Sequence, residues 1–139
     1  MELQLGSVNW LAILVCVVVG QVFLTVWFAV VFARPWAKAY GVDEPKQHTN
    51  EVPGYTYGIG LLCVVLLSLG LSLLQENLGI ATVGGGLSVG FFVAVHFSIA
   101  TALPGYAFLR RWRACALALG SQATLILILS AILAAFQLG

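Results

Sequence analysis

The chain has 139 residues, of which 61% are hydrophobic and only 8% are charged. A soluble domain carries about 45–50% apolar and about 25% charged residues, so this composition excludes both a water-soluble globule and a disordered chain. Six Lys and Arg against five Asp and Glu leave a net charge of +1, which excludes the basic face of a nucleic-acid-binding protein. The sequence therefore predicts an integral membrane protein, with residues 1–139 forming one domain.

Four apolar stretches follow one another along the chain, and each is long enough to cross a bilayer as a helix. They run over about 9–32, 57–74, 82–107 and 114–136. A hydrocarbon core about 30 Å thick needs roughly 20 helical residues. Because the apolar runs are continuous rather than alternating, they indicate helices and not barrel strands. We therefore expect an all-α membrane protein with four transmembrane helices in a bundle.

Positive charge is confined to the segments that follow the first and third stretches. The Lys and Arg residues there are Arg34, Lys38, Lys46, Arg110, Arg111 and Arg113. Lys and Arg are concentrated in cytoplasmic loops, so the loops 33–56 and 108–113 are predicted to be cytoplasmic. Both termini are then expected outside, in a protein of an inner membrane.

A short helix is predicted in the first of these loops. Pro35 suits the first position of a helix, and Trp36 and Tyr40 lie four residues apart before Gly41, a residue type that ends helices. We expect a helix over 35–40 whose aromatic face lies on the lipid headgroups. The predicted interfacial anchors of the whole chain are Trp10, Arg34, Trp36, Tyr40, Arg110 and Trp112.

Three hydrogen-bonding side chains are predicted near the middle of the membrane. Gln21, His96 and Gln122 lie at similar depth in the first, third and fourth stretches. Intramembrane polar groups are unfavourable unless paired, so we expect a neutral His96 to donate to Gln21 or Gln122 as structural glue. The alternatives for His96 are a proton-relay or pH-sensing group, or an axial ligand to a haem or chlorophyll-type pigment.

Small residues recur every fourth position in the third stretch and form one continuous helix face. They are Gly86, Gly90, Ala94, Ser98 and Ala102. Such a stripe lets another helix approach closely, while His96 falls on roughly the opposite face. One face is expected to meet the bundle and the other a second subunit or lipid. A lesser groove of the same kind is Ser130-x-x-x-Ala134.

The first 41 residues carry a pattern that resembles a known family. Asn9 opens the first stretch, Trp27 comes late in it, and Trp36 and Gly41 follow it. This pattern is similar to the signature of the membrane family called domain of unknown function 1761. The resemblance implies a small four-helix membrane protein, mostly bacterial, with no established activity, and it marks these four positions as family-defining without a chemical role.

The expected function is that of a structural or accessory membrane subunit that forms oligomers through small-residue helix faces. The alternative is a small-solute, ion or proton transporter or channel whose pathway passes His96, Gln21 and Gln122. We expect no enzyme, because the spans hold no Ser-His-acid set and no carboxylate pair. No cofactor, metal or nucleic acid is expected; the expected partners are the lipid bilayer and further copies of this chain or subunits of a larger complex.

Overall fold

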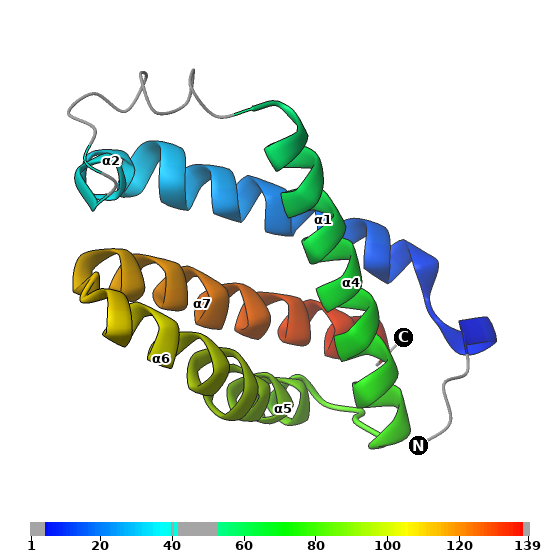
Figure 1. Cartoon of the computed structure of the whole chain (residues 1–139). Coiled ribbons are helices and arrows are strands. Elements are labelled where there is room, and N and C mark those ends of the chain that lie inside the picture. Colours follow the sequence, from blue (N-terminus) through cyan, green and yellow to red (C-terminus); the bar gives the residue numbers. More distant parts are fainter. Residues whose placement is uncertain (1–4, 40, 42–52, 138–139) are drawn as a thin grey trace.

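The structure is a computed structural model that describes residues 5–39, 41 and 53–137. These residues form helices and short turns, with no strand among them (Figure 1). In chain order the elements are η1 (Leu5–Ser7), α1 (Trp10–Val26), η2 (Trp27–Val31), α2 (Ala33–Ala39), α4 (Tyr55–Asn77), α5 (Val83–Val93), η3 (Ala94–Ile99), α6 (Ala100–Leu109) and α7 (Trp112–Gln137). Because η2 and η3 are π-helical turns, α1–η2 and α5–η3–α6 each form one continuous helical segment.

Four helical segments are long and apolar enough to cross a membrane: Trp10–Val31, Tyr55–Asn77, Val83–Leu109 and Trp112–Gln137. The all-α fold with four such helices is confirmed, and the short helix expected in the first loop is α2. In each segment, at most 44% of the most apolar 18 residues are buried inside the chain. Most apolar side chains therefore face outward, an arrangement that is stable only where the surroundings are themselves apolar.

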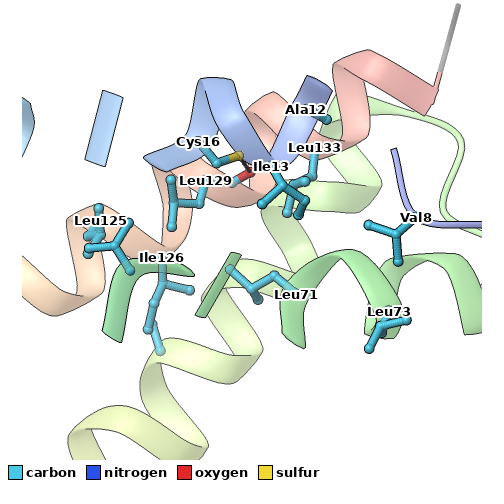
Figure 2. Packing of buried hydrophobic residues seen from close by; sticks show 12 residues of the cluster. Val8, Ala12, Ile13, Cys16, Leu71, Leu73, Leu125, Ile126, Leu129 and Leu133 are labelled. Carbon is cyan, nitrogen blue, oxygen red and sulfur yellow. Dashed lines mark hydrogen bonds between the residues drawn. The ribbon is translucent and has the colours of Figure 1, made fainter. Parts of the chain in front are cut away.

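Helix α7 is the centre of the bundle. α5 packs along it most extensively, and α1 lies on the side of α7 away from α5 and α6 (Figure 1). The core cluster surrounds Leu129 of α7, which is fully buried, and includes Cys16 of α1 and Leu71 of α4 (Figure 2). The Cys16 thiol donates a weak hydrogen bond to the carbonyl oxygen of Leu129 over 3.9 Å, so α1 and α7 are in direct contact at this level.

Polar residues and glycine mark where helices begin and end. The side chain of Asn9 accepts a hydrogen bond from the backbone N–H of Ala12 at 3.1 Å and so caps α1. Thr82 caps α5 in the same way, by accepting from the N–H three residues on. Gly41, predicted to end the short helix, has φ of +76°, a conformation that favours glycine. Asn9 and Gly41, two of the positions predicted to be family-defining, thus mark a helix start and a helix end.

The small-residue stripe packs against α7 of the same chain. Gly86, Gly90 and Ala94 are buried. A Cβ added at Gly86 would lie 2.5 Å from the Ala134 Cβ, and one added at Gly90 would lie 2.6 Å from the Ser130 hydroxyl. Only glycine allows this approach of the two backbones. At these three residues the stripe is therefore the face of the third helix that meets its own bundle.

Two of the predicted anchors, Trp10 and Trp112, begin long helices at opposite ends of the bundle. Trp10 begins α1 and Trp112 begins α7, and both are well exposed. Arg34 is exposed on α2, and Trp36 of α2 is half-buried. Tyr40 lies outside the described residues, as does Lys46.

Candidate functional site

A cavity of about 700 Å³ lies between α1, α2, α4, α5–η3–α6 and α7. It occupies the half of the bundle near α2 and the α6–α7 turn (Figure 1). Its volume is within the range of about 300–1,000 Å³ that is typical of ligand sites, and it is open rather than enclosed. The apolar residues of its wall include Leu24, Phe28, Trp36, Leu67, Phe97 and Leu125.

Two polar side chains form a hydrogen-bonded pair on the cavity wall. The Ser98 hydroxyl donates to Oε1 of Gln122 at 3.0 Å and thereby joins η3 to α7. Among the described residues nothing accepts a hydrogen bond from Nε2 of Gln122, and this side chain is exposed. The pair therefore offers a hydrogen-bond donor to a molecule in the cavity.

Two further hydroxyls of the wall, on Thr101 and Ser121, are satisfied by their own helices. Thr101 donates to the carbonyl oxygen of Phe97, and Ser121 donates to that of Ala118 at 2.7 Å. This pattern leaves Gln122 as the amide whose hydrogen-bonding capacity is not used up within the protein. A ligand head is therefore expected to bind near Gln122.

Aromatic residues of the N-terminal segment form and support one end of the cavity. Trp36 and Phe28 both line it, with ring centroids 4.5 Å apart. Behind them Trp27 donates from Nε1 to the carbonyl oxygen of Leu117 in α7 at 3.1 Å. Gly120 leaves room for that indole, since a Cβ there would lie 3.3 Å from the ring. Trp27, predicted only as family-defining, thus holds the end of the α1–η2 segment on α7. Trp36, predicted as family-defining and as an interfacial anchor, forms part of the cavity wall.

The two π-helical turns border the same cavity. η2 contributes Phe28, and η3 contributes Phe97 and Ser98. A π turn inserts an extra residue into a helix and redirects the side chains that follow, and such turns are frequent at functional sites. Sequence periodicity assumes regular helices, so neither turn was predicted.

The three midplane residues do not meet. His96 is exposed, its Nδ1 lies 3.1 Å from the carbonyl oxygen of Phe92, and its ring stacks on that of Phe92. Gln122 lies on the cavity wall, whereas Gln21 does not line the cavity and its Nε2 is buried without a hydrogen-bond partner in the described structure. The expected clasp between His96 and either glutamine is therefore not formed.

A polar contact that was not predicted from the sequence joins three helices. Gln75 of α4 is fully buried and donates from Nε2 to the carbonyl oxygen of Ser130 at 2.9 Å, next to Gly86. The spacing of polar residues in the sequence could have indicated this contact, because Ser68, Ser72 and Gln75 recur at helical intervals on one buried face of α4. This contact fixes α4 against the α5–α7 pair and leaves the other half of α4 free to border the cavity.

The cavity wall is electrically neutral. No Asp, Glu, Lys, Arg or His is among the described residues that line it, and the described part of the chain holds no group of three or more potential metal ligands. An ion entering the cavity would lose its hydration without gaining an opposite charge. The site is therefore suited to an uncharged molecule with an apolar body and a hydrogen-bonding head.

The sequence matches one protein family over most of its length. The family is described as Protein of unknown function (DUF1761), and the match covers residues 11–134. No curated protein and no solved structure matches the chain. The resemblance expected from the N-terminal signature is confirmed, and it brings no activity with it.

Proposed function

The chain belongs to the DUF1761 family, and we propose that it is a membrane-embedded binding protein for an uncharged, lipid-like molecule. The observation that carries the proposal is the neutral cavity of about 700 Å³ with its single hydrogen-bonded pair, Ser98 and Gln122. Binding of this kind is an accessory role, as favoured by the sequence, and not an enzymatic one.

The occupant follows from the distribution of polarity on the wall. Apolar side chains such as Leu24, Leu67 and Leu125 suit an alkyl or isoprenoid chain, and the open side lets such a chain reach the surrounding lipid. The amide of Gln122 suits a hydroxyl or carbonyl head, because both N–H groups of its Nε2 are available as donors in a site of low polarity. A charged head is disfavoured by the neutral wall.

The transporter or channel alternative has less support from the same geometry. It requires a polar path through Gln21, His96 and Gln122, yet His96 lies on an exposed face and hydrogen bonds within its own helix. We therefore place the function in the cavity and not in the midplane cluster.

The proposal includes an orientation. Lys38 of α2 shares a depression with Arg110, Arg111 and Arg113, and positive charge favours the cytoplasmic side. We propose that this end faces the cytoplasm of a bacterial inner membrane, with the loops 33–56 and 108–113 inside and both termini outside. The cavity then opens in the cytoplasmic half of the bilayer.

Association with further copies or with a larger complex stays a prediction. Since α7 covers Gly86, Gly90 and Ala94, another face has to be used. α1 presents an exposed apolar row at helical spacing, consisting of Leu11, Leu14, Val18 and Val22. A native mass measurement in mild detergent gives the copy number directly.

Binding is tested with a brominated long-chain alcohol, which quenches tryptophan fluorescence when it reaches Trp36. In lipid nanodiscs the alcohol is expected to bind saturably, and Gln122→Leu is expected to weaken binding about fivefold, the effect of about one net hydrogen bond. Gln21→Leu is the matched control, because it makes the same change at a glutamine that does not line the cavity. An alkyl phosphate of equal chain length is expected to bind far more weakly.

Two results would overturn the proposal. One is quenching that rises linearly with alcohol in every variant, which indicates partition into the bilayer alone. The other is an equal affinity for the alkyl phosphate, which contradicts the selection against charge.

A further inference from the structure

A second depression, of about 440 Å³, lies where the end of α2 meets the turn between α6 and α7. Lys38 lines it from α2, and Arg110, Arg111 and Arg113 line it from the turn and the start of α7. No acidic residue lines it among the residues that the structure describes. Within the same described ranges Lys38, Arg110 and Arg113 have no ion-pair partner.

We propose that this basic depression binds the phosphate headgroup of an anionic phospholipid. The inference goes beyond the proposed function, because it concerns another site and an anionic ligand. Like charges brought together in one depression repel one another, and a phosphate that contacts several of them removes this repulsion. The first turn of α7 also lines the depression, through Trp112 to Ala114, and adds the positive end of a helix dipole.

The surroundings of the depression indicate that the anion is carried by a lipid. Phe108 is 89% exposed, Leu109 is 68% exposed and Trp112 is 60% exposed. Three large apolar side chains on one turn are stable when they enter the acyl region, and tryptophan favours the headgroup level. The cations beside them then lie at the depth of lipid phosphates, where basic pockets bind anionic headgroups.

The backbone of Arg110 provides a variant that separates binding from folding. Arg110 has φ of +54°, in the left-handed region that glycine adopts without strain. Its N–H and that of Arg111 close the end of α6 by donating to the carbonyl oxygens of Ala107 and Tyr106, a hydrogen-bond pattern in which glycine is the usual residue. Arg110→Gly therefore removes a cation while it relieves the backbone, so a loss of binding in this variant is not a loss of fold.

The experiment measures lipid adducts by native mass spectrometry on the purified chain in a non-ionic detergent. The probes are phosphatidylglycerol, phosphatidylcholine with the same acyl chains, and inorganic phosphate. Phosphatidylglycerol is expected to bind at least tenfold more tightly than phosphatidylcholine. Each cation removed from the depression is expected to weaken the binding of phosphatidylglycerol about fivefold. Arg110→Gly is therefore expected to lower the affinity about fivefold, and Arg110→Gly combined with Arg113→Gln about 25-fold.

Arg34→Gln is the matched control. It removes one positive charge from the same end of the molecule, on α2, but Arg34 does not line the depression. An unchanged affinity for phosphatidylglycerol in Arg34→Gln, with losses in the other variants, supports the site. Equal losses in all of these variants would show attraction to net charge only and would overturn it. Competition by millimolar inorganic phosphate would overturn the assignment to a lipid.

Discussion

The contact between α5 and α7 depends on the absence of a side chain at Gly90. A Cβ at this position would lie 2.6 Å from Oγ and 2.8 Å from Cβ of Ser130, whereas ordinary van der Waals contact begins near 3.4 Å. Gly90→Ala therefore requires a displacement of about 0.8 Å. The helix cannot yield easily by tilting, because Gly86 one turn earlier is in still closer contact with α7.

The size of the effect follows from two opposing terms. Overpacking of a well-packed interface costs about 1–3 kcal/mol, while alanine is favoured over glycine inside a helix by up to about 1 kcal/mol. Gly90→Ala is therefore expected to lower the free energy of unfolding by about 1–2 kcal/mol. Gly70→Ala is the matched control in α4, because a Cβ there meets nothing within 4 Å; it is expected to be neutral or slightly stabilising.

The assay is reversible unfolding in mixed micelles, in which an ionic detergent is titrated and the loss of helix is followed by circular dichroism. The difference in unfolding free energy between the two variants is the quantity to compare. If Gly90→Ala proves as stable as Gly70→Ala, α5 and α7 are not packed backbone to backbone, and the description of the stripe is wrong.

Three further changes have expected outcomes in the same assay. Asn9→Ala removes the cap of α1 and is expected to lower the unfolding free energy by about 1 kcal/mol, whereas Asn9→Asp retains the acceptor and most of the stability. Trp27→Phe keeps an aromatic ring but loses the indole N–H that donates to the carbonyl oxygen of Leu117, so the unfolding free energy is expected to fall by at least about 1 kcal/mol; an unchanged unfolding free energy would contradict this hydrogen bond to α7. Arg110→Gly is expected to raise the unfolding free energy by about 1 kcal/mol, and a decrease would contradict the left-handed conformation.

The helices and several of their ends could be predicted because these features depend on local sequence. A continuous apolar run is sufficient to define a span, and Gly41 ends α2 through its own backbone conformation. The stripe on α5 was likewise visible as spacing. The helix that packs on this stripe could not be predicted. Small residues indicate that another helix approaches closely, but not whether that helix is α7 of the same chain or belongs to another copy.

The site was harder to predict because it depends on rotation about helix axes. Gln21, His96 and Gln122 share a depth, yet depth leaves the direction of each side chain open. The π turn η3 includes His96 and Ser98, so the residues after its insertion no longer follow the regular 3.6-residue period. As a result Ser98, predicted as a packing residue, pairs with Gln122, and His96 does not.

The most direct test of the binding cavity uses a cysteine that the chain already contains. Cys63 is exposed and lines the cavity, while Cys16 and Cys115 are buried, so a small permeant maleimide is expected to label Cys63 alone. Saturating long-chain alcohol is predicted to slow this labelling severalfold in nanodiscs, and to lose most of that protection in Gln122→Leu. Labelling of Cys63 at the same rate with and without the alcohol would contradict the account.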